Sequence, residues 1–231
     1  MESESSRSVV RDSLGVGLAA GSFGVAFGAA SVSAGLSTLQ TMLLSLLAFT
    51  GGTQFAVIGV VSGGGTLAAA LSSGLLLGAR NTLYGMRLAP LLRPHGVRRL
   101  VVAQGTIDET TAMAVARRDP ALGRLAFWCT FAGCFVVWNT ATAIGAVGAR
   151  ALGDPAKFGL DAVIPAAFLA LLAPRLYAGA VERRVAVGAG VIALALIPFT
   201  PPGIPVLAAC AALLLAGIPV GRRHDPVRAS R

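Results

Sequence analysis

The sequence predicts an all-α polytopic integral membrane protein with about six to eight membrane segments, at least one of them discontinuous or re-entrant. Three observations lead to this fold class. First, 55% of the 231 residues are hydrophobic and only 13% are charged, whereas soluble domains carry roughly 25% charged residues. Second, residues 13–79 carry no formal charge. At roughly 20 residues per crossing, that run is long enough for three closely connected spans.

The third observation is the placement of the basic residues that give the chain its net charge of +9. They form short clusters between apolar segments: Arg93, Arg98 and Arg99; Arg117, Arg118 and Arg124; Arg183 and Arg184; Arg222, Arg223 and Arg228. This pattern is typical of the cytoplasmic loops that orient a membrane protein. Basic soluble segments with interleaved aromatic residues are lacking, so we expect no nucleic-acid partner.

Eight apolar segments follow one another along the chain: 14–35, 40–62, 66–92, 100–116, 125–149, 160–181, 185–198 and 205–220. The clearest span is 125–149, which is uncharged and contains Trp128 and Trp138. The last two segments are the weakest, because a Pro- and Gly-rich turn leaves about 14 residues on each side of it. We expect one transmembrane transport domain at 13–220, between a cytoplasmic N-terminal tail at 1–12 and a basic cytoplasmic tail at 221–231.

The first segment carries glycines on one helical face, at spacings of four, three and four residues: Gly17, Gly21, Gly24 and Gly28. Such small residues let two helix backbones approach closely. Two interpretations remain open at this point. The face packs against another helix of the same chain, or it docks another subunit.

The second and fourth segments are expected not to cross the membrane completely. If the N-terminus is cytoplasmic and the first three segments all cross, the Arg93–Arg99 cluster would lie outside, against the positive-inside rule. Segment 40–62 is interrupted by Thr50–Gln54, and segment 100–116 is short and contains two acids. With both segments incomplete, every basic cluster becomes cytoplasmic.

A first candidate binding element is the interruption itself, which consists of Thr50, Gly51, Gly52, Thr53 and Gln54, with Phe55 adjacent. Glycines at mid-membrane expose backbone N–H and C=O groups, which transporters use to bind substrates at broken helices. The alternative is a glycine-rich close-packing site with a capping threonine.

A second candidate is Arg80 with Asn81 and Tyr84, followed by the acids Asp108 and Glu109. A buried guanidinium is suited to bidentate contact with a carboxylate. The acids could neutralise Arg80, bind a substrate ammonium or relay a proton, unless 100–116 is an interfacial helix with both acids in water. Asp161, near a segment start, is explained by the helix N-terminus alone.

Several functions are disfavoured. Lys157 is the single lysine and no P-loop motif is present, so the chain itself is not a P-loop ATPase. His95 and His224 lie in a loop and a tail, and the three cysteines lie in apolar runs. No catalytic constellation is present. We therefore expect no enzyme activity, cofactor or metal.

Five strings resemble, in order and spacing, the AzlC family of branched-chain amino-acid exporters: GVAFGAA (24–30), LAFTGGTQFAVIG (47–59), ARNTLYGMRLAPLL (79–92), DETTAMA (108–114) and GLDAVIPAAFLALLAP (159–174). The resemblance implies a large permease subunit that works with a small hydrophobic AzlD-type partner in the bacterial cytoplasmic membrane. It also implies export of leucine, isoleucine and valine, and sometimes methionine, driven by the proton-motive force.

One departure from the family pattern is Asn81, where family members commonly have histidine after the arginine. Since asparagine exchanges no proton near neutral pH, coupling would rest on Asp108 or Glu109. In the resulting hypothesis, Arg80 attracts the substrate carboxylate, the element around Gly51 and Gly52 supplies backbone polar groups, and an acid meets the ammonium. The alternative is a pore or assembly subunit for a small neutral solute, whose partner chain carries the transport site.

Overall fold

A computed structural model describes residues 5–152, 163–201 and 203–217, and these residues form helices and turns with no strand. The chain divides into two compact units, Met1–Phe168 and Leu169–Arg231, which are described separately. Asp161, Lys157, His224 and the predicted tail at 221–231 lie outside the described residues.

Two helical stretches of the first unit are long and apolar enough to cross a membrane. One consists of α1 (Ser6–Ser22) and α2 (Gly24–Ser33), which are nearly continuous because the Phe23 N–H still donates to the Ala20 carbonyl at 3.2 Å. The other is α9 (Pro120–Ala151), which starts with a proline after Asp119, whose carboxylate accepts from the Ala121 N–H at 2.8 Å. The helix predicted at 125–149 is therefore present and has spanning length.

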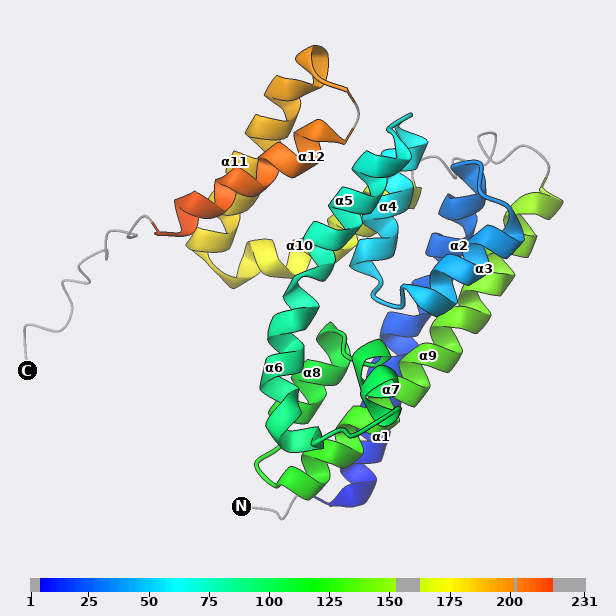
Figure 1. Ribbon diagram of the computed structural model, residues 1–231, viewed down its shortest axis with the longest axis vertical. Coiled ribbons are helices and arrows are strands. Elements are labelled where there is room, and N and C mark those ends of the chain that lie inside the picture. Colours follow the sequence, from blue (N-terminus) through cyan, green and yellow to red (C-terminus); the bar gives the residue numbers. More distant parts are fainter. Residues whose placement is uncertain (1–4, 153–162, 202, 218–231) are drawn as a thin grey trace, which may run out of the picture. The chain divides into compact units, whose positions relative to one another are not determined.

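The glycine face of the first segment packs against α9, with the two stretches running in parallel (Figure 1). A Cβ atom added to Gly17 would lie 2.9 Å from the carbonyl carbon of Gly133, and one added to Gly28 would collide with the Thr142 carbonyl oxygen. Gly21 and Gly24 face the same helix. Packing within the chain is therefore the correct interpretation, and the docking interpretation of this face is wrong.

The segment predicted at 40–62 is broken into α3 (Thr38–Leu47) and α4 (Gly52–Ser62). The turn between them ends at Gly51, whose φ of 61° lies in the region that side chains disfavour. A capping box between Ser37 and Gln40 starts α3. At about 1.5 Å per residue, each helix reaches about 15 Å, which is half of a membrane core.

The segment predicted at 66–92 bends at Ala79, between α5 (Leu67–Gly78) and α6 (Arg80–Leu92). The helix tightens here, because the Thr82 N–H donates to the Ala79 carbonyl three residues back. Gly74 lets α5 lie against α4, since a Cβ there would meet the Val57 side chain at 2.9 Å. The bend was not predicted, and it places Arg80 at the start of a helix.

The segment predicted at 100–116 is also broken, into α7 (Arg98–Gln104) and α8 (Asp108–Val115). These helices of seven and eight residues reach only about 10–12 Å each. In Figure 1, α7 and α8 lie toward the end of α9 at which α1 starts, whereas α3 and α4 lie toward its other end.

The remaining helices are α10 (Val163–Ala178), α11 (Ala180–Leu196) and α12 (Ile204–Ala209), with 3₁₀ turns at Ile197–Phe199 and Cys210–Gly217. The helix predicted at 185–198 starts at Ala180 and so includes Arg183 and Arg184 in its first turns. The predicted break before α12 is present, at Gly203 with a φ of 96°.

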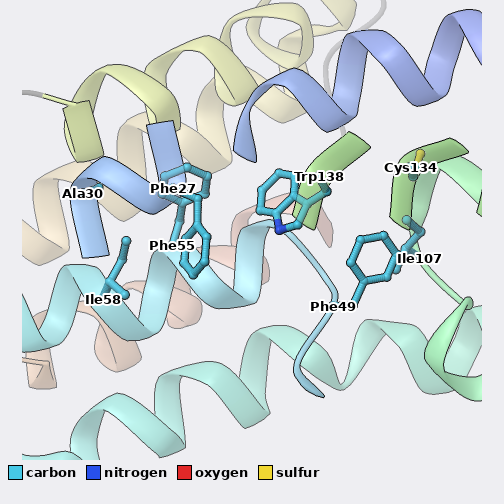
Figure 2. Packing of buried hydrophobic residues seen from close by; sticks show 8 residues of the cluster. All are labelled: Phe27, Ala30, Phe49, Phe55, Ile58, Ile107, Cys134 and Trp138. Atoms are coloured by element: carbon cyan, nitrogen blue, oxygen red, sulfur yellow. The ribbon is translucent and has the colours of Figure 1, made fainter. Parts of the chain in front are cut away.

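An aromatic cluster joins the broken helices of the first unit to α9 (Figure 2). Phe27 of α2 stacks on Trp138 with ring centroids 5.8 Å apart, and Phe55 of α4 meets Phe27 edge-on at 5.7 Å. Phe49 from the α3–α4 turn and Ile107 from the α7–α8 turn belong to the same buried cluster. The two turns are therefore anchored in one core.

Candidate functional site

Three helices of the first unit start around one group of side chains. Arg80 is the first residue of α6, Asp108 is the first residue of α8, and Gly52 is the first residue of α4. Arg80 Nη1 and Asp108 Oδ2 form an ion pair at 2.8 Å, with side chains that are 29% and 31% exposed. The structure thus brings together two predicted site residues that come from separate segments.

The start of α4 lies directly against this ion pair. A Cβ atom on Gly52 would lie 3.2 Å from Arg80 Nη2, so the glycine makes room for the guanidinium. Helix N-termini carry partial positive charge. Asp108 is stabilised by its own helix start, and the guanidinium beside the start of α4 leaves this place attractive to a further carboxylate.

Several polar atoms around the pair are buried and have no hydrogen-bond partner. On the pair itself these are Arg80 Nε and Asp108 Oδ1. On α4, α5, α6 and α8 such atoms are Thr53 Oγ1, Ser73 Oγ, Asn81 Oδ1 and Thr111 Oγ1. Buried polar groups are normally satisfied, and unpartnered ones occur on α2, α3 and α9 as well, at Ser31, Thr41, Thr130 and Trp138. The unpartnered atoms of the pair itself, Arg80 Nε and Asp108 Oδ1, are therefore the ones that favour a polar ligand at this site.

Glu109 adds a second carboxyl group to the site. It follows Asp108 in the first turn of α8 and lies within electrostatic reach of both Arg80 and Asp108. Cys134 of α9, which is buried, is the neighbour of Glu109 on the scaffold side. The site therefore holds the ion-paired Arg80 and Asp108, with Glu109 as the next residue of the same helix start.

Other predicted residues shape the site without facing the ion pair. The Gln54 side chain is fully buried; its Oε1 accepts from the Gly51 N–H at 3.1 Å, and its Nε2 donates to the Leu44 carbonyl at 3.1 Å. Thr50 donates to the Ala48 carbonyl. Both residues hold the α3–α4 turn in place.

Phe55, another predicted site residue, lies in the core, as does Phe49 of the α3–α4 turn. Phe55 and Phe49 are 1% and 4% exposed, and each packs against aromatic rings of other helices. Tyr84 lies one turn beyond Arg80 on α6, and Asn81 follows Arg80 directly. These positions put Asn81 and Tyr84 on the helix that presents the guanidinium.

Gln104 is a polar residue of this region that the sequence interpretation missed. Its Nε2 donates to the Leu46 carbonyl at 2.6 Å, which links the end of α7 to the end of α3. The Gln104–Gly105–Thr106 run, polar and glycine-containing inside an apolar segment, resembles Thr50–Gln54 and was a usable signal. Ser45 was also missed: it donates to Asn139 Oδ1 of α9 at 2.8 Å.

Two apolar helical stretches of spanning length, with an ion pair where shorter helices break between them, are features of an α-helical membrane protein. The family model described as AzlC protein matches residues 15–152, which is more than half of the chain and includes every candidate site residue. The chain belongs to the AzlC family.

Two relatives are similar over much of the chain. An uncharacterized membrane protein of Archaeoglobus fulgidus is 32% identical over 196 residues, which cover 83% of this chain and 84% of the relative. The branched-chain amino acid transport protein AzlC of Bacillus subtilis is 27% identical over 154 residues, which cover 64% of this chain and 59% of that protein. No solved structure matches the chain significantly.

Proposed function

We propose that this chain is the large subunit of a secondary exporter of branched-chain amino acids, with leucine, isoleucine, valine and methionine as the substrate class. The observation that carries the proposal is the Arg80–Asp108 ion pair at the meeting point of three helix starts. The name of the Bacillus subtilis relative supports the same substrate class.

The proposed site exchanges its internal ion pair for a zwitterion. The α-carboxylate takes the place of Asp108 beside Arg80, and the α-ammonium takes the place of Arg80 beside Asp108 or Glu109. A zwitterion is the one small solute that replaces both members of the pair at once, so neither charge is left unpaired in a low-dielectric site. The free atoms of Thr53 and Thr111 are available to the same ligand.

The proposed coupling follows from competition for the carboxylates. A proton and a substrate ammonium neutralise the same acids, so the site carries either an amino acid or a proton. Exclusive occupancy of this kind is antiport, in which inward proton movement drives outward amino-acid movement. Asp108 and Glu109 carry this role because Asn81 offers no titratable group.

The proposed topology places the arginine-rich end of the first unit in the cytoplasm. Arginines gather in the first turns of α1, from the end of α6 into the start of α7, and from the end of α8 into the start of α9: Arg7, Arg11, Arg93, Arg98, Arg99, Arg117, Arg118 and Arg124. The turns at the opposite end, 34–37 and 63–66, are uncharged. By the positive-inside rule, the N-terminus is cytoplasmic, α3–α4 re-enters from outside and α7–α8 re-enters from the cytoplasm.

The partner proposed for this subunit is a small hydrophobic membrane protein of the AzlD type, in a bacterial cytoplasmic membrane. Long apolar side chains point outward from α5 and α6 and suit either lipid or such a partner: Leu71, Leu75, Leu76, Leu83 and Met86. Residues 13–220 are proposed to act as one transport domain.

The test is radiolabelled leucine efflux from cells that lack other exporters. Three strains are compared: one expresses this chain alone, one expresses this chain with an AzlD-type partner, and one expresses the partner alone. We expect saturable efflux with both chains, and its loss on adding an uncoupler. Flux that neither saturates nor responds to the uncoupler would identify a pore. Efflux by the partner alone would identify this chain as an assembly subunit.

A further inference from the structure

The first unit contains two successive stretches with the same sequence of elements. Residues 6–62 consist of a long segment, α1–α2, interrupted only at Phe23, followed by the helical hairpin α3–α4. Residues 67–115 consist of a bent long segment, α5–α6, followed by the helical hairpin α7–α8. In Figure 1 the two hairpins lie toward opposite ends of α9, so the second stretch runs in the opposite direction to the first.

The two hairpin turns are built in the same way. In each, the polar side chain of the third residue of the second helix accepts a hydrogen bond from the N–H of the residue that precedes this helix. Gln54 accepts from Gly51 at 3.1 Å, and Thr110 accepts from Ile107 at 3.1 Å. The same side chain also reaches back toward the first helix: Gln54 donates to the Leu44 carbonyl within α3, and Thr110 donates to the carbonyl of Gly105, the residue that follows α7. Gly52 and Asp108 thereby become equivalent positions.

Arg80 lies between these equivalent positions. Its Nη1 contacts Asp108 of the second turn, and its Nη2 would be 3.2 Å from a Cβ on Gly52 of the first turn. The matching interruption of the first stretch is at Phe23, after which α2 begins with Gly24. Arg80 therefore comes from the second stretch only, while the turns of both hairpins lie against its side chain.

The two turns touch each other directly. The Gln104 amide, in the last turn of α7, donates to the Leu46 carbonyl in the last turn of α3 at 2.6 Å. Phe49 and Ile107 are buried together in the aromatic cluster. A hairpin that moves away from Arg80 must break these contacts, whichever hairpin moves.

We propose that residues 6–62 and 67–115 are inverted repeats whose hairpins act as two gates on the Arg80 site, and that Gln104 is the positioning residue that holds the hairpin tips closed. Opening α7–α8 exposes Arg80 to the arginine-rich end, and opening α3–α4 exposes it to the opposite end, where the turns 34–37 and 63–66 lie. Inverted repeats with broken helices at a central site are a recurring solution for alternating access. The proposal rests on the proposed function only for the role of the Arg80 site.

The test measures access to the site from each end and needs no knowledge of the substrate. A reporter cysteine replaces Asn81 in a chain whose Cys129, Cys134 and Cys210 are changed to alanine or serine. Labelling by a membrane-impermeant maleimide is then compared in right-side-out and inverted vesicles. We expect labelling from both sides. Labelling from one side only would overturn the two-gate proposal.

A second experiment cross-links the two hairpin tips. Leu46→Cys and Gln104→Cys are added to the reporter chain and joined by a short bifunctional reagent while the reporter is reversibly protected. We expect cross-linking to slow labelling at least tenfold from both sides, and cleavage of the linker to restore it. Unchanged labelling of the cross-linked protein would overturn the proposal.

A single substitution tests the same contact between the hairpin tips without a cross-linker. We expect Gln104→Ala to raise the labelling rate of the reporter several-fold, because the closed state loses its hydrogen bond between the tips. Gln40→Ala is the matched control, since Gln40 accepts from the Ser37 N–H at the far end of α3. Equal labelling rates for the two variants would show that Gln104 does not hold the hairpin tips closed. If the labelling follows this pattern but leucine is not transported, the proposed substrate is wrong and the two-gate proposal is still supported.

Discussion

Two parts of the first unit differ in how their helices pack. The glycine scaffold, formed by α1, α2 and α9, is close-packed backbone against backbone: Gly17 faces Gly133, and Gly28 faces the Thr142 carbonyl. The broken-helix region, formed by α3 to α8, has no long helix and contains the Arg80–Asp108 pair. One part brings uncharged backbones together, and the other brings helix ends and charges together.

This contrast shows where a membrane protein tolerates irregular backbone. A broken helix leaves N–H and C=O groups without intrahelical partners, and those groups are acceptable only inside protein or beside a polar ligand. The scaffold shields the breaks from lipid on one side, since Gly105 of the α7–α8 turn lies against Phe131 of α9. A rigid scaffold beside a region of short helices is the arrangement expected of a transporter in which only one part moves.

The largest expected effect comes from adding volume to the scaffold. Gly28→Val should lower the free energy of unfolding by about 3 kcal/mol, because the new Cβ collides with a backbone carbonyl that has no room to move. Thermal unfolding of the purified protein in detergent measures the loss. Gly15→Val on α1 is the control, since a Cβ there meets nothing within 4 Å. Equal stability of the two variants would contradict the close-packed scaffold.

The second prediction removes the charge at the centre of the broken-helix region. Arg80→Gln should reduce leucine efflux about 10–100-fold, which corresponds to losing a charged hydrogen bond of roughly 1.5–3 kcal/mol. Arg87→Gln, on the same helix but exposed, should keep efflux within about twofold of the parent. Full efflux by the Arg80 variant at equal expression would refute the assignment of the substrate carboxylate to Arg80.

A smaller effect is expected from crowding the guanidinium without removing it. Gly52→Ala places a methyl group 3.2 Å from Arg80 Nη2, so the side chain must shift by a few tenths of an ångström. We expect a several-fold loss of efflux with little change in stability, because small displacements of a binding group weaken the productive geometry. Gly63→Ala, at the other end of α4, makes ordinary contacts at 3.5 and 3.7 Å and should leave efflux unchanged.

The smallest effect concerns a contact that joins the two parts. Arg98 of α7 lies over the Trp128 ring of α9, 5.3 Å from its centroid. Arg98→Gln should cost about 0.5–1 kcal/mol of stability and leave efflux intact. The exposed Arg118 provides the control, as Arg118→Gln should change stability by less than about 0.5 kcal/mol. A large loss of efflux with the Arg98 variant would mean that α7 is positioned by this contact.

The sequence alone predicted the helical class of the chain, the glycine face at Gly17–Gly28 and the interruption of 40–62 at Thr50–Gln54. Each of these follows from local chemistry: hydropathy, helical spacing, and residues such as Gly51 that interrupt a helix. The tertiary structure decided that the glycine face meets α9, that the chain bends at Ala79, and that Arg80 pairs with Asp108. Spacing along the chain fixes which residues share a helix face. Which faces and helix ends meet depends on the packing of separate segments, and no local pattern specifies that.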